Sequence, residues 1–227
     1  MDARTASTIV IPAKNEARTV GDVVTEARCY ASHVLVVDGH SDDGTAAIAE
    51  RAGAAVLLDH GKGKGDAIRT ALPHLHTMVT VFVDADGSHR VSDVPLLVDP
   101  ILAGDADHVS ASRLIGGSSE LHGGFDEFFR LSGNAFITTC INRRFHVSLS
   151  DSQNGFRAIR TDVLHSLGLR ENLTTIEQEM IIKTLRQGYR VAEVPSHELR
   201  RQYGTSHINP WRVAPRYAYS LLKYLLR

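Results

Sequence analysis

The chain has 227 residues, of which 43% are hydrophobic and 22% charged, a composition typical of a globular protein with a sizeable core. With a formal net charge of −1, the molecule has no overall positive potential to attract nucleic acid, so we exclude nucleic acid as a partner. The two cysteines, Cys29 and Cys140, lack metal-binding spacing, and no segment resembles a signal peptide or a membrane span. We therefore expect one cytoplasmic domain.

Short apolar strands alternate with helices in the first half of the chain. The sequence predicts strands at 8–11, 34–37, 55–58 and 78–83, and helices at 16–30, 46–52 and about 66–75, with Asn15 capping the first helix. This alternation is typical of a parallel sheet with right-handed crossovers, in which ligands bind beyond the carboxyl ends of the strands. The four loops at those ends are all polar and span 12–16, 38–45, 61–65 and 84–89.

Two carboxylates, Asp84 and Asp86, end the strand at 78–83. Alternate residues of an extended chain share a side, and like charges at the end of a buried strand are costly without a cation between them. Magnesium is commonly bound by one or two carboxylates together with substrate phosphates, so the pair predicts a metal site. A turn that two aspartates merely cap is the alternative, because so short a motif often arises by chance.

The second half is less regular. Prolines at 95 and 100 predict only short or kinked helical turns, and the glycine-rich run 116–124 is interpreted as a mobile loop. We expect a helix over 125–141 with Phe125, Phe129, Ser132 and Phe136 on one stripe. The remaining expected elements are strands at 107–112 and 190–194, a polar turn at 151–157 before a short strand, and a helix at 177–187.

Several motifs occur together in a characteristic order. They are Ile11-Pro12-Ala13-Lys14-Asn15-Glu16, Asp38 to Thr45, Lys62-Gly63-Lys64-Gly65, Asp84-Ala85-Asp86, Ser112-Arg113, Asp151 to Arg157, Glu193-Val194-Pro195 and Arg201 to His207. The set resembles glycosyltransferase family 2, and its later members resemble the dolichyl-phosphate mannosyltransferase-like branch, over about residues 7–210.

The resemblance implies a GT-A fold, an α/β domain with a mostly parallel sheet flanked by helices. It would divide into a nucleotide-sugar-binding half (7–112), an acceptor-side half (113–209) and a C-terminal helix (210–227). The implied function is inverting, Mg²⁺- or Mn²⁺-dependent transfer of a hexose from a GDP-mannose- or UDP-glucose-type donor to a polyprenyl-phosphate-like acceptor. A soluble hydroxyl acceptor is the alternative, as is a catalytically silent nucleotide-sugar-binding protein, against which the intact Asp84, Asp86 and Asp151 argue.

Donor and metal residues follow from the resemblance. It implies that the nucleoside contacts Pro12, Ala13, Asn15, Glu16 and Asp38 and that Asp86 ligates the metal, with Asp84 near the ribose or the metal shell. Ser88 stands where the branch often has a glutamine ligand, so Ser88, His89 or water would complete the shell. Lys64 and Ala85 are further substrate-binding candidates, although the lysine–glycine loop lacks the spacing of a P-loop.

The chemistry of transfer predicts the remaining site residues. The leaving diphosphate gains negative charge, so Arg113, Arg130 and Arg201 are candidate phosphate ligands, each with a solvated surface arginine as the alternative. Glu179, or else Glu177, is the candidate general base, although acids also favour the first turn of a helix, and a phosphate acceptor needs no strong base. The resemblance adds four contacts with the donor sugar, the acceptor or phosphate: Asp151, Gln153, Ser206 and His207.

The last part of the chain is basic and amphipathic. Six basic and no acidic residues lie between 200 and 227, with apolar residues at helical spacing over 210–227. Such a helix suits an anionic membrane surface, which would place the protein at the inner face of the membrane. The alternative is a helix packed on its own domain or on a second subunit of a homodimer.

Overall fold

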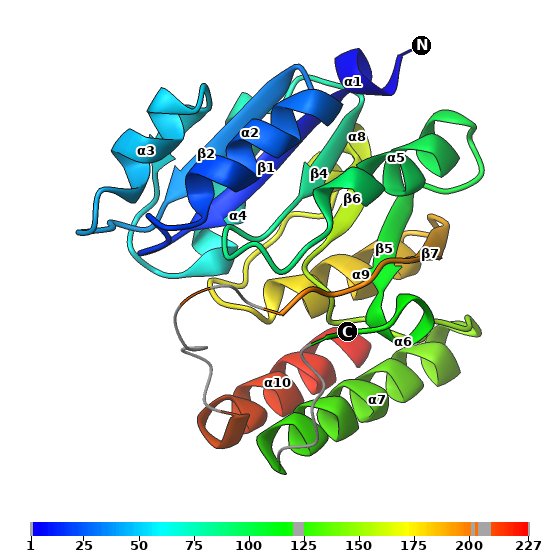
Figure 1. The fold of residues 1–227 in the computed structure, drawn as a ribbon. Helices are drawn as coiled ribbons and strands as arrows, with labels where there is room; N and C mark the ends of the chain where they lie inside the picture. The colour runs from blue at the N-terminus through cyan, green and yellow to red at the C-terminus, as the bar shows by residue number, and fades with distance from the viewer. Residues whose placement is uncertain (1, 120–124, 201–202, 204–209, 227) are drawn as a thin grey trace.

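Seven strands form one sheet in the order β3-β2-β1-β4-β6-β5-β7 (Figure 1). They span Ser7–Ala13 (β1), His33–Asp38 (β2), Ala55–Leu58 (β3), Val79–Phe82 (β4), His108–Ser112 (β5), Arg157–Arg160 (β6) and Val191–Pro195 (β7). The computed structural model describes residues 2–119, 125–200, 203 and 210–226, with only the backbone at 125–129 and 210–212. Neighbouring strands are parallel except where β6 pairs with β4 and β5, so the predicted mostly parallel sheet is confirmed.

Helices cover both faces of the sheet. They are Ala3–Ala6 (α1), Val20–Tyr30 (α2), Thr45–Arg51 (α3), Lys64–Ala71 (α4), Val94–Leu102 (α5), Arg113–Gly116 (α6), Phe125–Phe145 (α7), Thr161–Ser166 (α8), Ile176–Arg186 (α9) and Pro210–Leu225 (α10), with 3₁₀ turns at Leu72–His74 and Val91–Asp93. Successive strand residues face opposite ways. Ile9 and Ile11 therefore pack with α2, α3 and α5, while Val10 packs with α4, α8 and α9.

A third layer lies outside α9. The helices α7 and α10 run side by side at the lower end of the molecule in Figure 1. Their buried residues Ile137, Ile141, Leu221 and Tyr224 share an apolar cluster with Ile181 and Ile182 of α9. The predicted C-terminal helix is thus packed on its own domain through one of its faces.

Several predicted elements differ in detail. The first helix begins at Val20 rather than at residue 16, because Asn15 has a φ of +56° and belongs to a turn. The region of Pro95 and Pro100 forms the nine-residue helix α5, since Pro95 lies in the first turn, where a missing N–H breaks no bond. Of the stripe predicted for α7, only Ser132 and Phe136 have described side chains, and both are exposed. Phe136 is 65% exposed, and the buried side carries Asn134 and the aliphatic residues that meet α9.

The glycine-rich run at 116–124 is only partly described. Gly116 ends α6, and Ser118 forms an isolated parallel bridge with Glu198. Residues 120–124, on which the prediction of a mobile loop mainly rests, lie outside the described part of the chain. The bridge brings the segment after β5 next to the segment after β7, at the acceptor side predicted from the sequence.

Candidate active site

The first two polar loops at the carboxyl edge of the sheet are joined by hydrogen bonds. The Asn15 backbone N–H donates to Ser41 Oγ at 2.8 Å, and the Asn15 side-chain oxygen accepts from the Asp42 N–H at 3.1 Å. The Glu16 N–H donates to Thr45 Oγ1 at 2.9 Å. Asn15 therefore binds the neighbouring loop instead of capping a helix. The two loops are thereby held together at the carboxyl edge of the sheet.

Asp38 ends β2 at this edge and is buried. Its Oδ2 accepts from the Ser41 N–H at 2.9 Å, whereas its Oδ1 is buried without a hydrogen-bond partner in the described structure. Ala13 pairs with Asp38 in the sheet, and the Ala13 carbonyl accepts from the Gly39 N–H. A buried, unpartnered acceptor is costly, so Asp38 Oδ1 suits an N–H donor from a bound ligand.

A single ammonium links the aspartate loop to the second half of the chain. Lys64, the first residue of α4, has its Nζ 2.6 Å from Asp84 Oδ1 and 2.8 Å from Glu177 Oε1. Burial alone would lower the pKa of Lys64, but the two carboxylates raise it well above its usual range. Burial would likewise raise the pKa of Asp84, but Lys64 and then His89 outweigh it and lower the pKa to about 2. Lys64 and Asp84 are therefore both charged at neutral pH.

Asp84 is enclosed on its other sides as well. His89 Nδ1 accepts from the Asp84 N–H at 3.1 Å, and the imidazole stacks on Phe156 with ring centroids 5.1 Å apart. Burial lowers the pKa of His89 despite the nearby Asp84, so the ring is neutral. A Cβ on Gly155 would lie 2.7 Å from Lys64 Nζ and 2.9 Å from Asp84 Oδ2. Only a glycine at position 155 lets the backbone approach the ion pair this closely.

Asp86 and Ser88 lie just beyond, in the turn after β4. Asp86 Oδ1 accepts from both the backbone N–H and the hydroxyl of Ser88, at 3.0 and 2.7 Å. Among the described residues, no three or more His, Cys, Asp or Glu side chains are grouped so as to hold a metal ion. One or two carboxylates and a hydroxyl fit Mg²⁺ or Mn²⁺ completed by phosphate oxygens and water, and do not fit a zinc site. Because Asp84 is already paired with Lys64, Asp86 is the better ligand.

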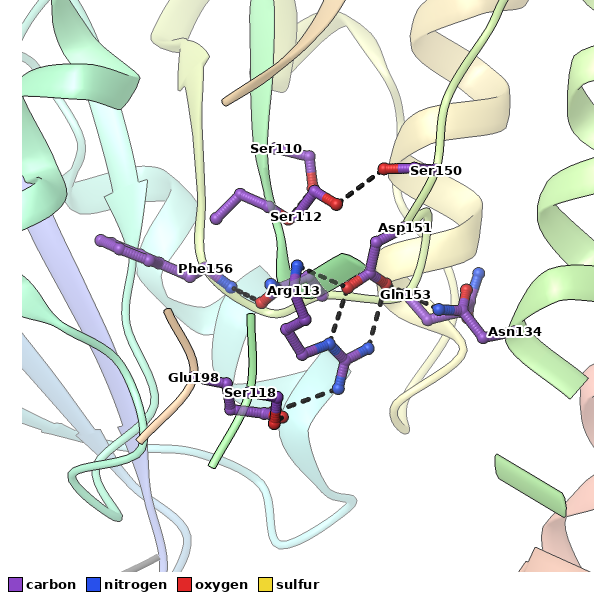
Figure 2. Close-up of polar contacts among 12 residues, drawn as sticks. Ser110, Ser112, Arg113, Ser118, Asn134, Ser150, Asp151, Gln153, Phe156 and Glu198 are labelled. Atoms are coloured by element: carbon purple, nitrogen blue, oxygen red, sulfur yellow. Dashed lines mark hydrogen bonds and ion pairs between the residues drawn. The ribbon is translucent and has the colours of Figure 1, made fainter. Parts of the chain in front are cut away.

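A second buried ionic group surrounds Asp151 (Figure 2). Arg113 Nε and Nη2 donate to the two carboxylate oxygens of Asp151 at 2.6 and 3.0 Å, and Arg113 Nη1 donates to Glu198 at 3.1 Å. Asn134 of α7 donates to Asp151 Oδ1 at 2.8 Å, and Glu193 of β7 accepts the Asp151 backbone N–H. Burial would raise the pKa of Asp151, but Arg113 holds it below its usual range. Arg113 thus fixes Asp151, and its guanidinium is already engaged by two acids.

Between the two ionic groups lies Arg157, whose side chain is fully buried. It donates to the backbone carbonyls of Asn154, Ser152 and Glu177. Burial lowers the pKa of Arg157 to about 10, although Glu177, Asp151 and then Asp84 favour its charge. Arg157 therefore remains a cation at neutral pH and ties the turn at 151–157 to the start of α9.

Glu179, the predicted general base, does not face this region. Its buried carboxylate accepts from the backbone N–H groups of Arg170 and Glu171, and Lys183 Nζ lies 2.7 Å away. These contacts fix the loop before α9. The alternative base, Glu177, lies in the Lys64 cluster, and its Oε2 is buried without a hydrogen-bond partner in the described structure. The placement favours Glu177 over Glu179.

Of the other predicted site residues, one is partly buried, one is exposed and three lie outside the described part of the chain. Gln153 Nε2 donates to Ser152 Oγ at 2.9 Å, and Gln153 Oε1 is buried without a described partner. Arg130 is exposed on α7. Arg201, Ser206 and His207 lie outside the described residues, so their roles stay predictions.

Sequence reasoning did not assign Asn134, Arg157, Glu193 or Glu198 to the site. Arg157 and Glu193 do stand in motifs of the resemblance, so their residue types were a usable signal. Asn134 and its neighbour Thr138 are polar residues on a helix face that is otherwise aliphatic, which is a weaker signal. Nothing local marks Glu198, because its pairing with Arg113 spans 85 positions of the chain.

Residues 8–168 match the family model described as glycosyl transferase family 2. Glycosyltransferase AglJ of Haloferax volcanii is 30% identical over 207 residues, which cover 90% of this chain and 67% of AglJ. The dolichyl-phosphate hexose transferase of the same organism is 28% identical over 224 residues, covering 96% of this chain and 93% of the relative.

A solved structure has the same fold. It is glucosyl-3-phosphoglycerate synthase from Mycobacterium tuberculosis in complex with Mn²⁺, uridine-diphosphate-glucose and phosphoglyceric acid. The similarity has a TM-score of 0.77 at 21% sequence identity and covers 96% of this chain and 79% of that one.

Proposed function

Because the chain belongs to glycosyltransferase family 2, we propose that it transfers a hexose from a nucleotide-diphosphate sugar to a lipid phosphate. The donor is of the GDP-mannose or UDP-glucose type, and the reaction inverts the anomeric carbon. The likeness to a dolichyl-phosphate hexose transferase supports the acceptor class, and the uridine-diphosphate-glucose and Mn²⁺ in the GT-A-like structural neighbour support a nucleotide sugar and a metal.

One observation carries this proposal most directly: the carboxyl ends of β2 and β4 present acidic side chains with different partners. Asp38 Oδ1 is a buried, unpartnered acceptor, suited to a nucleobase N–H. Two strands along the sheet, Asp84 is held by Lys64, while Ser88 fixes Asp86. Since adjacent strands lie about 4.8 Å apart, Asp38 and Asp84 are separated by roughly 10 Å, a span that suits a nucleoside diphosphate.

Asp86, supported by Ser88, is the residue that would hold the divalent metal. When bound, the metal would stabilise the negative charge that develops on the leaving diphosphate. Lys64 keeps Asp84 ionised and fixes its side chain, and Gly155 lets the turn at 151–157 pack against the pair. Arg113 positions Asp151 instead of binding phosphate, since its donors already bind Asp151 and Glu198.

The acceptor decides whether a base is needed. A phosphate oxygen is already ionised at neutral pH and can attack without giving up a proton, so transfer to a lipid phosphate requires no side-chain base. Transfer to a hydroxyl would require one. Glu177 would then be better placed than Glu179, because Glu177 contacts Lys64 in the cluster and Glu179 fixes a distant loop.

The test is a donor and acceptor panel with radiolabelled sugar. UDP-glucose and GDP-mannose would each be incubated with Mg²⁺ or Mn²⁺ and with either a short polyprenyl phosphate or phosphoglyceric acid. We expect label in the organic phase with the polyprenyl phosphate, and loss of that label when the metal is chelated. If label appears only in a water-soluble product, the acceptor is a soluble hydroxyl compound and not a lipid phosphate.

Two variants make this test specific. Asp86→Asn should lower turnover at least about 100-fold, because a metal ligand is lost. Asp99→Asn changes an exposed aspartate on α5 and should leave turnover unchanged. Absence of donor turnover in the unaltered protein, together with no thermal shift by UDP or GDP plus metal, would favour the catalytically silent alternative.

A further inference from the structure

The outer face of the α7–α10 layer is apolar although one side of each helix is already buried. On α10 and just after it, Pro215, Ala218, Tyr219, Leu222 and Leu226 are exposed, and each lies three or four residues from another of the five, so they share a face. Tyr219 is 67% and Leu222 58% exposed. Phe136 of the adjacent α7 is likewise exposed. We call these six residues the outer apolar face.

Basic residues accompany this face. Of the described side chains of α7 and α10, at 130–145 and 213–226, five are basic, and the acidic residues of α7, Asp126 and Glu127, come at its start. Arg143, Arg144 and Arg216 are exposed, the first two at the end of α7, beside the end of α10. Lys223 is instead turned inward to Glu171. An exposed apolar stripe with basic neighbours is the pattern of helices that lie in an anionic membrane interface.

The inner faces of the same two helices reach the acceptor side of the site. Asn134 of α7 donates to Asp151, and Tyr217 of α10 donates to Thr174 Oγ1 at 2.8 Å, three residues before Glu177. The outer apolar face therefore lies one helix thickness from the acceptor-side residues. No described helix is both long and apolar enough to cross a bilayer.

We propose that the outer apolar face docks the protein onto the surface of an anionic lipid bilayer. A symmetric contact with a second copy is less favourable, because it would bring two copies of the same basic surface, with Arg143, Arg144 and Arg216, close together. A bilayer with anionic headgroups instead matches both the apolar stripe and its positive neighbours. This docking deepens the proposal of a lipid-phosphate acceptor but does not depend on the transfer reaction.

Co-sedimentation of the full chain with vesicles tests the proposal without any donor or metal. The vesicles would be phosphatidylcholine alone or phosphatidylcholine with phosphatidylglycerol. The unaltered protein should sediment with the anionic vesicles and be released by high salt, because surface attraction is screened. Tyr219→Glu/Leu222→Glu should weaken binding about tenfold or more, since two apolar side chains would no longer enter the interface.

Leu96→Glu is the matched control, because Leu96 is also an exposed apolar residue on a helix, α5, on another part of the molecule. It should bind vesicles like the unaltered protein. Arg143→Gln/Arg144→Gln should reduce the preference for anionic vesicles while leaving weak binding to neutral ones. Circular dichroism of each variant would verify that it folds.

Three results would overturn the proposal. They are no sedimentation of the unaltered protein, equal sedimentation of Tyr219→Glu/Leu222→Glu, and a dimer in light scattering that this double variant dissociates, which would assign the face to a second copy. Vesicle binding in a protein without donor turnover would leave the docking surface standing and refute only the proposed transfer. Turnover without vesicle binding would support the proposed transfer and refute the docking surface.

Discussion

Asp84 is held ionised by positive and polar groups from separate parts of the fold. Lys64 comes from the start of α4, and His89 from the loop after β4. Glu177 shares the ammonium of Lys64 but belongs to α9. The cluster is therefore a point at which three segments must be correctly placed together, and its charge state depends on pH.

The pH dependence of stability should reveal the Asp84 contribution. Its pKa is lowered from 3.8 to about 2 in the folded chain. The unfolded chain therefore takes up this proton first as the pH falls, so the stabilisation is complete above about pH 4 and is lost between pH 4 and 2. The shift corresponds to about 2 kcal/mol.

Urea denaturation at pH 7, 4 and 3 would measure this effect. Asp84→Asn should unfold more easily at pH 7 and approach the stability of the unaltered protein as the pH falls toward 2. Asp99→Asn, an exposed aspartate, should keep the original pH profile. Parallel profiles for Asp84→Asn and the unaltered protein would contradict the assignment of a lowered pKa to Asp84.

Gly155 offers a second test at the scale of single residues. Gly155→Ala would push a Cβ against Lys64 Nζ and Asp84 Oδ2, so either the turn at 151–157 or the ion pair itself must shift. We expect turnover to fall by roughly 100-fold, the size of effect that a misplacement of about 1 Å produces. Gly133→Ala is the control: Gly133 lies within α7 with open space around its Cβ position, so this change should stabilise the protein by about 0.5–1 kcal/mol. Equal turnover in both variants would remove Gly155 from the site.

At the scale of elements, the loop before α9 links α10 to the start of α4. Glu171 accepts from Lys223 Nζ at 2.8 Å and from Tyr224 O–H at 3.0 Å, both on α10. The Glu171 carbonyl lies so close to Gly65 that no side chain fits there. The C-terminal helix is thereby mechanically connected to the helix that carries Lys64.

Removing this link should loosen α10. Glu171→Ala removes the carboxylate to which Lys223 and Tyr224 both donate, at a cost of about 2 kcal/mol, and hydrogen exchange in α10 should accelerate more than in β1. Asp162→Ala is the control, since it removes an exposed pair with Arg160 and should change stability by less than about 0.5 kcal/mol. Uniform acceleration across the sheet would show that Glu171 supports the whole fold rather than α10.

The strands and the strand-end site were predictable from local sequence, whereas several other elements were not. Apolar runs ending at Asp38 and Asp84 mark β2 and β4 directly, and strand–helix alternation fixes their parallel pairing. The short helices α6 and α8 and the antiparallel direction of β6 leave no periodic signal. The sequence of α7 contains both an aromatic and an aliphatic stripe, and only the structure shows that the aliphatic one, with Ile137 and Ile141, packs against α9. The sequence named both Glu179 and Glu177 as base candidates, and the preference for Glu177 rests on its three-dimensional contact with Lys64.

For the whole molecule, a formal net charge of −1 conceals an uneven distribution. Acidic residues gather at the carboxyl edge of the sheet and in the buried groups around Asp84 and Asp151, while the described surfaces of α7 and α10 are basic. The same layer that completes the third apolar cluster also carries the outer apolar face. Deleting residues 210–227 would therefore remove core and surface together, and it would not separate membrane docking from folding.

Two adjacent leucines of α10 separate these roles. Leu221 is 4% exposed and packs in the cluster with Ile181 and Ile182, so Leu221→Ala should cost about 2–4 kcal/mol in the free energy of unfolding. Leu222 points outward, so Leu222→Ala should change stability by less than about 0.5 kcal/mol but weaken vesicle binding several-fold. Urea denaturation and vesicle co-sedimentation on both variants give a two-by-two comparison. The assignment of two distinct faces to α10 predicts opposite outcomes for the neighbouring positions, and equal losses of stability in both variants would contradict it.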